Sequence, residues 1–257
     1  MPDLDNSDLM QIADEPVPEP ALSPAPAALH RTWPTWIEIL LCSGYPTQLL
    51  VGQMLVLAGF PPQLWDGRLS GTFVFALSLV DSALLISLIV FLLVRRGERP
   101  LAVLFGGRAV GREAAIGAWS LPFILAMVMA LTIGIRRVLP SLHNVPDNPL
   151  EGLAGSGANL WLFLIVVIVA GGVREELQRA FLLHRFRGDL GQPWMGLLIT
   201  SISFGMGHTL QGLDAAIITG MLGATWGAIY LKRESAIASM VSHSLFNSAE
   251  LLRVVTG

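Results

Sequence analysis

The sequence predicts an all-α protein: a polytopic transmembrane helix bundle of about seven spanning helices, preceded by a disordered, acidic and proline-rich tail. Of its 257 residues, 53% are hydrophobic and only 14% are charged, whereas an average soluble domain has about 25% charged residues. The mean hydropathy of +0.62 points the same way. Within the apolar stretches, polar side chains gather in three short clusters, which are costly in a bilayer and so indicate a functional site.

Residues 1–30 differ from the rest of the chain. They contain six acidic residues, no Lys or Arg, and several prolines. Such a segment cannot bury enough apolar surface to offset its ordering entropy, so we expect residues 1–30 to be disordered and residues 31–257 to form the transmembrane helical domain. The segment lacks the basic start and early apolar core of a signal peptide, so the first apolar helix should direct membrane insertion.

A helix needs about 20 mostly apolar residues to cross ~30 Å of hydrocarbon. Seven stretches approximately meet this requirement: 36–59, 71–94, 114–135, 158–182, 194–210, 213–231 and 236–255. We expect Gly44 and Pro46 to kink the first stretch, and Pro193 to begin the fifth. In the sixth, Gly223 and Gly227 form a GxxxG pattern that permits close helix approach.

Basic residues in the loops predict the orientation in the membrane. One side carries Arg95, Arg96, Arg99, Arg108, Arg112, Arg185, Arg187, Lys232 and Arg233. The other side carries Arg68, Arg136 and Arg137. The richer side should be cytoplasmic. We therefore expect an integral protein of a bacterial plasma (inner) membrane, with its N-terminus in the cytoplasm and its C-terminus outside.

The first polar cluster lies at the end of the fourth stretch. Glu175 and Arg179 are four residues apart, so on a continuous helix they share a face and can pair. Glu176 points about 100° away, toward a different neighbour. Arg174 and Glu176 can equally lie in water or lipid headgroups at the cytoplasmic end of the helix. Taken alone, this cluster leaves a structural and a functional interpretation open.

The other two clusters lie in the fifth and seventh stretches. Phe204 precedes His208, which places an imidazole deep in an apolar helix beside two glycines. His243 and Asn247 are one helical turn apart on one face. Both need hydrogen-bond partners in lipid, so we expect them to face the bundle interior. Each of these side chains could, by itself, be a packing residue or a polar contact between helices.

Together the clusters hold the groups needed to activate water. A carboxylate can take a proton from a water molecule held beside an imidazole. A second imidazole and an amide can then donate hydrogen bonds to the oxyanion that forms. A divalent metal is the competing arrangement, because two His and one Glu match a catalytic zinc ligand set. Neither HExxH nor GxSxG occurs, and we expect Asp81 to be a hydrogen-bonded interior or helix-end residue that forms no catalytic pair with Asp214.

These residues, at these intervals, resemble the CPBP family of CAAX proteases and bacteriocin-processing enzymes, also called the type II CAAX prenyl endopeptidase or abortive-infection family. Its motifs are EExxxR, FxxxH and HxxxN or HxxxB on successive membrane helices. Phe204–His208 and His243–Asn247 fit the second and third motifs without adjustment. The resemblance covers roughly residues 160–250, so the catalytic core should lie at about 158–255.

The first motif departs from the family pattern by one place. The family's Arg follows the first Glu by five residues, but here that position is Ala180, and Arg179 follows Glu175 by four. Either Arg179 serves from the neighbouring position, or the register slides and Arg174 occupies the place of the first Glu. We assign the catalytic role to Glu175 in the first register, with Glu176 as the competing candidate.

The resemblance implies an endopeptidase that hydrolyses peptide bonds within or beside the membrane; eukaryotic relatives remove the last three residues of prenylated CaaX proteins. Family members have been described as metalloproteases and as metal-independent, glutamate-dependent enzymes. In the second mechanism, which we expect here, Glu175 activates water beside His208 while His243 and Asn247 hold the oxyanion, and no cofactor is required. In the first, Glu175, His208 and His243 would bind a divalent metal such as zinc.

Two other classes of function stay open. In an ion- or proton-coupled transporter, Glu175, His208 and His243 would form a relay, although the inverted repeat expected of such a protein is not evident. A non-catalytic membrane scaffold or immunity protein would have the fold of the family without its activity. The shifted position of Arg179 is the best support for this alternative. The expected partners are the lipid bilayer and a peptide or protein substrate, and no nucleic acid. The sequence does not indicate an oligomeric state.

Overall fold

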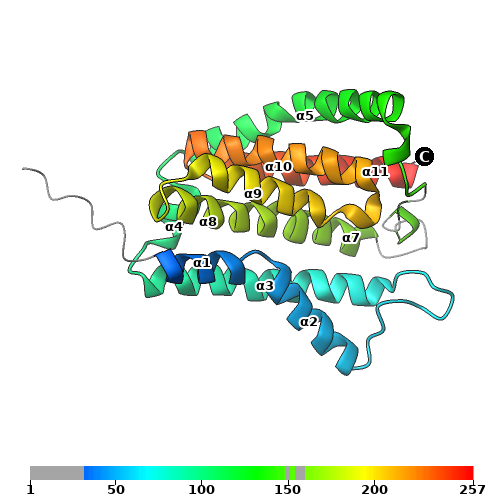
Figure 1. The fold of residues 1–257 in the computed structure, drawn as a ribbon, viewed down its shortest axis with the longest axis horizontal. Helices are drawn as coiled ribbons and strands as arrows, with labels where there is room; N and C mark the ends of the chain where they lie inside the picture. Colours follow the sequence, from blue (N-terminus) through cyan, green and yellow to red (C-terminus); the bar gives the residue numbers. More distant parts are fainter. Residues whose placement is uncertain (1–31, 147, 149–150, 154–159, 257) are drawn as a thin grey trace, which may run out of the picture. The chain divides into compact units, whose positions relative to one another are not determined.

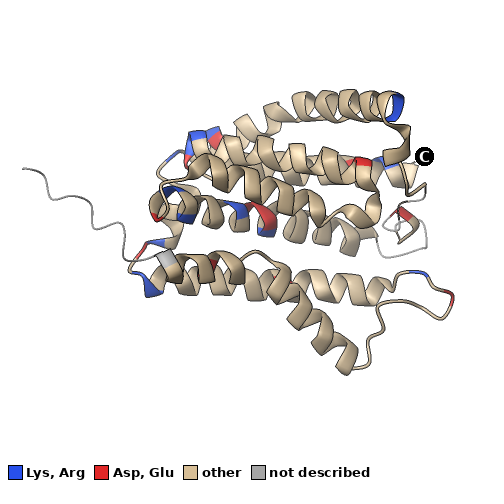
Figure 2. Cartoon of the chain, viewed as in Figure 1, with Lys and Arg blue, Asp and Glu red and all other residues tan. Residues whose placement is uncertain are grey.

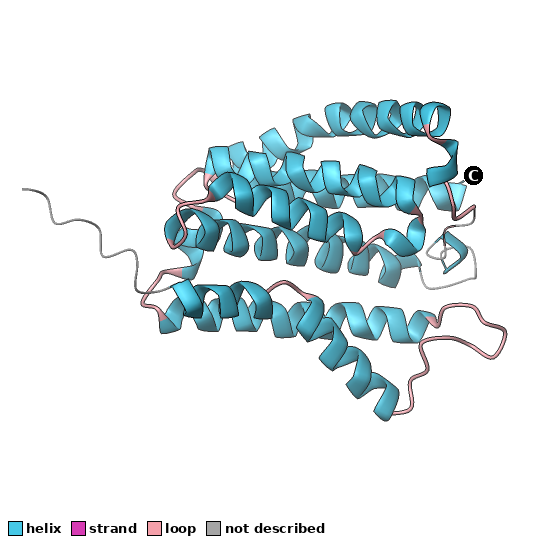
Figure 3. Cartoon of the chain, in the orientation of Figure 1, coloured by secondary structure: helices cyan, strands magenta, loops and turns pink. Residues whose placement is uncertain are grey.

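The computed structural model describes residues 32–146, 148, 151–153 and 160–256. Across these residues every regular element is a helix (Figure 3), and β pairing is limited to an isolated bridge between Gln63 and Leu69. The prediction of an all-α protein is confirmed. The predicted disordered tail, residues 1–30, lies outside the described residues.

Helices occupy all seven of the predicted apolar stretches (Figure 1). The longer helices are α1 (Thr32–Leu41), α2 (Tyr45–Leu57), α3 (Gly71–Arg95), α5 (Val110–Val138), α8 (Glu175–Gly188), α9 (Pro193–Met206), α10 (Leu213–Arg233) and α11 (Ile237–Thr256). The shorter ones are α4 (Pro100–Phe105), α7 (Leu160–Val166), the π-helix η2 (Val167–Arg174) and the 3-10 turns η1 (Pro140–Leu142) and η3 (Thr209–Gln211).

Three of the described helices are long and apolar enough to cross a membrane, namely α3, α5 and α10. A fourth span results if α1 and α2, which meet at a bend of 43°, form one broken helix. Gly44 lies in this break with a φ of 89°, a left-handed conformation that favours glycine, so the predicted kink is confirmed. The count of seven spans is not confirmed. Helix α9 has only 14 residues, and charged side chains lie within the consecutive helical segments α7, η2 and α8. That count and the predicted orientation stay predictions.

Glycines let neighbouring helices approach closely. Helix α10 packs along α9, and α11 packs along α5 and η2. A Cβ atom at Gly205 would lie 2.5 Å from the carbonyl oxygen of Ala216, and one at Gly117 would lie 2.3 Å from the carbonyl oxygen of Ala238. Small residues are expected at such contacts, because helices in lipid gain little from the hydrophobic effect and associate through close packing.

The predicted GxxxG pattern serves the same purpose inside this chain. A Cβ atom at Gly223 would lie 2.9 Å from the ring of Phe204, and one at Gly227 would lie 2.5 Å from a methyl group of Leu197. Both neighbours belong to α9. The prediction of close helix approach is therefore confirmed, and the pattern seats α10 against the helix that precedes it.

The outer surface of the bundle is apolar. Large side chains such as Trp119, which is 82% exposed, Phe123 and Leu198 face outward from α5 and α9, as expected of a surface that meets lipid. Lys, Arg, Asp and Glu gather mainly near the ends of the helices, with a further group inside α8 (Figure 2). That group contains the first polar cluster.

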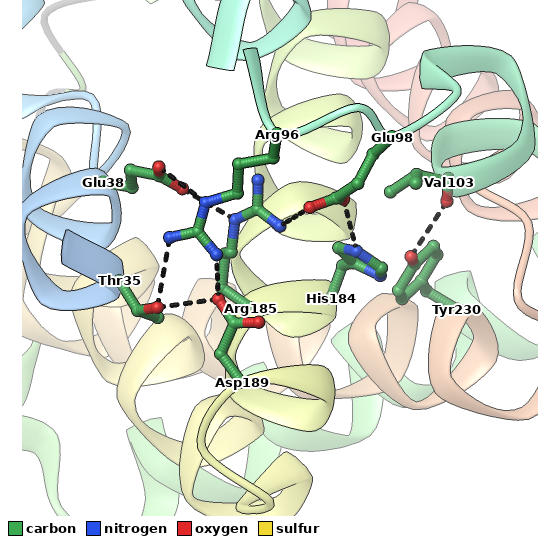
Figure 4. A network of polar contacts seen from close by, with 9 residues as sticks. All are labelled: Thr35, Glu38, Arg96, Glu98, Val103, His184, Arg185, Asp189 and Tyr230. Carbon is green, nitrogen blue, oxygen red and sulfur yellow. Dashed lines mark hydrogen bonds and ion pairs between the residues drawn. The ribbon is translucent and has the colours of Figure 1, made fainter. Parts of the chain in front are cut away.

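A second set of charges joins the far end of α8 to α1 and α3, and we call it the α8 clamp (Figure 4). Arg185 is 1% exposed and its Nε donates to Glu38 at 2.8 Å. Arg96, the residue after α3, also donates to Glu38 at 2.8 Å and to Asp189. The hydroxyl of Thr35 donates to Asp189 at 2.7 Å. The clamp therefore fixes the carboxyl end of α8, about three turns from the polar cluster.

Candidate active site

The fourth predicted helix is interrupted where the first polar cluster begins. Residues Val167–Arg174 are π-helical, between the α-helical α7 and α8, so the expectation of a continuous α-helix is wrong over these residues. Short π-helical segments frequently mark functional sites. A Cβ atom at Gly172 would lie 1.9 Å from the Ser244 hydroxyl, and one at Gly171 would lie 2.4 Å from the Asn247 amide. Glycine at both positions brings η2 against α11.

The two adjacent glutamates, at the start of α8, have different surroundings. Glu176 is 1% exposed, and its Oε1 accepts hydrogen bonds from Arg179 and, at 2.9 Å, from Nδ1 of His243. The side chain of Glu175 is 22% exposed and lines a cavity. Its Oε2 lies 3.7 Å from Nε2 of His243, which is beyond direct hydrogen-bond distance.

One expectation about this cluster is wrong, and one of the alternatives left open for it does not apply. Arg179 pairs with Glu176, three residues before it, and not with Glu175, because Glu176 turns toward the buried side of α8 where the guanidinium also lies. Arg174 and Glu176 do not lie in water or headgroups, since both are buried. The early Arg of the first motif thus still reaches a glutamate of that motif.

His243 lies between the two glutamates. Because Glu176 is held by the guanidinium of Arg179, it is an ionised carboxylate that can only accept, so Nδ1 of His243 must carry the proton between them. Its Nε2 then points toward Glu175. The indole of Trp226 stacks on the imidazole, with ring centroids 3.8 Å apart and planes 16° apart. These contacts hold the ring in one orientation.

Trp226 was not among the residues predicted from the sequence. It is fully buried in α10, and its Nε1 donates to the hydroxyl of Ser242 at 3.1 Å. A buried tryptophan usually needs a hydrogen-bond partner for its N–H. This need is the feature of the sequence that could have drawn attention to Trp226. Nothing in the spacing of Trp226 relative to the three motifs shows that it lies on His243.

His208 is not inside a helix, contrary to expectation. Helix α9 ends at Met206, and His208 occupies the turn before η3. Glycine is a poor helix former, and Gly205 and Gly207 flank this end. The Nδ1 of His208 donates to the carbonyl oxygen of Phe204 at 2.8 Å, so Nε2 is free to accept a proton or a hydrogen bond.

Phe204 connects the second motif to the other two. Its ring lies 4.9 Å from that of His208 and 5.9 Å from that of His243, both edge to face. The guanidinium of Arg179 lies 4.6 Å from the same ring, a cation–π contact. Phe204 therefore contacts both imidazoles and covers the cation that holds Glu176.

Asn247 connects the third motif to the π-helix. Its Nδ2 donates to the carbonyl oxygen of Val167 at 3.3 Å. One N–H of the amide is used by this contact, and the second is available to a ligand. The amide therefore lies at the contact between α11 and η2 that Gly171 makes possible.

The described residues line a partly open cavity of about 860 Å³. Of the residues predicted to be functional, Glu175, Arg179, Phe204, His208, His243 and Asn247 line it, whereas Glu176 does not. A second pair, His143 and Asp214, lines the same cavity, with Nδ1 of the imidazole 2.9 Å from the carboxylate. The structure thus brings the four predicted catalytic residues to one space.

The suggested metal ligands do not form a metal site in this arrangement. Across the described part of the chain, no three His, Cys, Asp or Glu side chains are close enough together to hold a metal ion. The Nδ1 atoms of His208 and His243 are both engaged by oxygen atoms of the protein, which leaves Nε2 of each ring for other partners. Glu175, His208 and His243 are therefore not grouped as the ligands of a metal ion in this arrangement of the described residues.

The fold and the cavity define a class of protein: an apolar helical bundle that holds a carboxylate, two imidazoles and an amide around an internal space. Residues 157–249 match the family model of the type II CAAX prenyl endopeptidase Rce1-like proteins. This match agrees with the family resemblance that the three motifs suggested, and that prediction is confirmed over residues 157–249. A search of the curated proteins found no match, and a search of the solved structures found none.

The match to this family model suggests a CAAX protease, a peptide hydrolase that acts in the membrane. Together with the apolar helices, it also indicates an integral membrane protein. Such an enzyme would lie in the bilayer and act on peptide substrates.

Proposed function

We propose that this protein is an intramembrane endopeptidase in which Glu175 activates a water molecule against a peptide bond. One observation carries the proposal: of the two adjacent glutamates, Glu175 faces the cavity, while Glu176 is occupied by Arg179 and His243. A general base must reach the proton that it removes. Glu175 lines the cavity in which such a proton would lie, together with His208, and this supports the proposal.

In the first step a water molecule lies between Glu175 and His208. The carboxylate takes one proton of the water, and Nε2 of His208 accepts a hydrogen bond from the other. The water oxygen adds to the carbonyl carbon of the substrate, and the C=O double bond becomes a C–O⁻ bond. The tetrahedral intermediate then expels the amine as the C–N bond breaks, and Glu175 returns its proton to the leaving nitrogen.

Donors on α11 face the developing negative charge. With Nδ1–H directed to Glu176, Nε2 of His243 can donate a hydrogen bond only when this nitrogen also carries a proton. The free N–H of the Asn247 amide is the second donor. Preorganised donors of this kind contribute about 2.7–4 kcal/mol each to transition-state stabilisation in other hydrolases.

The proposed substrates are membrane-associated peptides, of which prenylated CaaX-type peptides are the class that the family name indicates. A lipid-anchored peptide would reach the cavity from the bilayer. The family match and the apolar surface of the bundle support this substrate class.

The test is cleavage of a fluorogenic farnesylated CaaX-type peptide by the purified protein in detergent. We expect Glu175→Gln to lower kcat by a factor of about 10² or more, because the amide cannot accept the proton. Its thermal unfolding should stay close to that of the wild type, since Glu175 makes no direct hydrogen bond to Arg179 or His243.

Glu176→Gln is the matched variant at the neighbouring position. It removes the charge that pairs with Arg179 and orients His243, so it should lower both thermal stability and kcat. Cleavage retained by Glu175→Gln and lost by Glu176→Gln at unchanged stability would move the catalytic role to Glu176. A wild-type protein that cleaves no such peptide would contradict the proposed substrate class.

A further inference from the structure

We propose that Asp81 of α3 and Arg174 of η2 form a positioning pair that holds Glu175 in the cavity. The inference rests on the proposed function, because it assigns a task relative to the proposed base. It concerns two side chains outside the three motifs. Both line the same cavity as Glu175.

The pair is direct and buried. Nη2 of Arg174 donates to Oδ2 of Asp81 at 2.5 Å, and the two side chains are 6% and 3% exposed. Nη1 of Arg174 donates to Oε1 of Gln178 at 2.9 Å. Arg174 is the last residue of η2, and Glu175 is the first residue of α8. The π-helix becomes an α-helix at this point of the chain, and the pair anchors this point to α3.

Gln178 extends the anchor to the break between α1 and α2. Its Nε2 donates to the carbonyl oxygen of Cys42 at 3.0 Å. A Cβ atom at Gly44 would lie 2.9 Å from Nη2 of Arg174 and 2.9 Å from Nε2 of Gln178. Glycine at this position thus allows the break to close onto both side chains. Three separate parts of the fold converge on the residue that precedes Glu175.

The cost of this arrangement argues for a task beyond packing. Burying an ion pair is costly unless every polar atom is satisfied, yet Oδ1 of Asp81 and Nε of Arg174 are buried without a hydrogen-bond partner. An apolar pair of similar size would avoid that cost. Charged residues inside a membrane bundle are functional candidates by default, and this pair lies beside the catalytic carboxylate.

The mechanism of positioning follows from chain geometry. Because Arg174 and Glu175 are adjacent in the chain, holding the guanidinium against α3 restricts the rotation of the backbone from which Glu175 projects. Loss of the anchor leaves the glutamate present but less well directed. A misplacement of 1 Å in a reacting group costs on the order of 100-fold in rate.

The experiment compares wild type, Asp81→Asn, Arg174→Gln and the double variant Asp81→Arg/Arg174→Asp in the farnesylated peptide assay. We expect each single variant to lower kcat by about ten- to a hundredfold with KM little changed. The exchanged pair should recover more activity than either single variant. Arg174→Lys, which keeps the charge, should retain intermediate activity.

Glu38→Gln in the α8 clamp is the matched control, because Glu38 accepts from a guanidinium that is 1% exposed and does not line the cavity. It should lower thermal stability with kcat largely kept. Unchanged kcat in Asp81→Asn, or a kcat loss in Glu38→Gln of the same size at equal loss of stability, would overturn the inference.

A second readout does not depend on activity. In a Glu175→Cys variant the introduced thiol can be labelled from the cavity, while the natural Cys42 is fully buried. Adding Asp81→Asn should change the labelling rate if the pair directs this position, and an equal rate would contradict the inference. Failure of the proposed function is recognised separately, as absence of cleavage by wild type or as full activity of Glu175→Gln.

Discussion

Glu175 and Glu176 are neighbours in the chain, but they meet different surroundings. Glu176 is held inside the bundle by a guanidinium and an imidazole, whereas Glu175 reaches the cavity. In the proposed mechanism, one carboxylate orients the imidazole of His243 and the other removes a proton. The difference follows from the helix, which turns about 100° between the two residues.

At the residue scale, Trp226 should matter for both stability and rate. We expect Trp226→Leu to lower the free energy of unfolding by roughly 2 kcal/mol or more, because a fully buried aromatic side chain is lost, and to lower kcat because the imidazole of His243 loses the ring stacked on it. Trp194→Leu, at a position 73% exposed, is the control and should change neither. Thermal unfolding and peptide cleavage measure the two effects. Normal kcat in Trp226→Leu would show that stacking does not orient His243.

The type and spacing of the polar side chains in the sequence indicated the candidate site residues. Glu175, His208, His243 and Asn247 were predicted as a set, and all four line one cavity. The pairing of Arg179 was predicted wrongly, because i and i+4 spacing does not decide between two adjacent carboxylates. Trp226 was missed because stacking between side chains of different helices leaves no periodic signal in the sequence.

At the scale of elements, the contact between η2 and α11 is the tightest part of the site. We expect Gly172→Ala to lower the free energy of unfolding by about 1–3 kcal/mol, since its Cβ atom would lie within 3 Å of three atoms of Ser244. Cleavage should fall as well, because Asn247 moves away with α11. Thermal unfolding in detergent measures the first effect.

Gly134→Ala in α5 is the control for that substitution, because a Cβ atom there meets nothing within 4 Å. It should be neutral, or stabilising by up to about 1 kcal/mol through helix propensity. Equal stability of the Gly172→Ala and Gly134→Ala proteins would argue that η2 can shift away from α11 at little cost.

The α8 clamp predicts a pH dependence at the other end of the same helix. Burial opposes ionisation of Asp189, but hydrogen bonds from Thr35 and Arg96 outweigh it and hold the pKa of this carboxyl below its ordinary value. The folded-state pKa is therefore lower than the unfolded one. The ionised carboxylate should stabilise the fold fully above about pH 4, and this contribution should be lost as the pH falls through the folded-state pKa.

The comparison of wild type with Asp189→Asn isolates this group. The difference in thermal stability should be constant near neutral pH and shrink toward zero below about pH 4. A difference that does not change across this range would contradict the assigned role of Asp189.

The helices were largely predictable, because apolar stretches of spanning length, and the glycines and prolines that break them, can be recognised in the sequence. The kink at Gly44 is an example. The π-helical form of Val167–Arg174 was not predicted, since it depends on how Gly171 and Gly172 meet α11. The end of α9 before His208 was not predicted either. It depends on the backbone conformation at Gly205 and Gly207, and glycine can adopt several conformations.

At the scale of the whole molecule, residues from three separate segments meet in one cavity without forming a metal-binding group among the described residues. The protein is incubated with EDTA or phenanthroline, and the chelator is then removed together with any metal that it holds. We expect the treated protein to cleave the peptide as before. Cleavage that is lost on chelation and restored by added zinc would show that the side chains regroup around a metal ion. As a control, the fluorescence of the free fluorophore is measured with and without the chelator, to show that the chelator does not change the assay signal.

The helical class, the approximate helix positions and the family resemblance could be predicted from the sequence alone, because hydropathy, turn residues and motif spacing are local properties. The tertiary structure decided which glutamate faces the cavity, which partner Arg179 takes, and that Trp226, Asp81 and Arg174 adjoin the site. These depend on the rotation and depth of one helix against another, and that packing is settled by glycines and side chains distant in the chain.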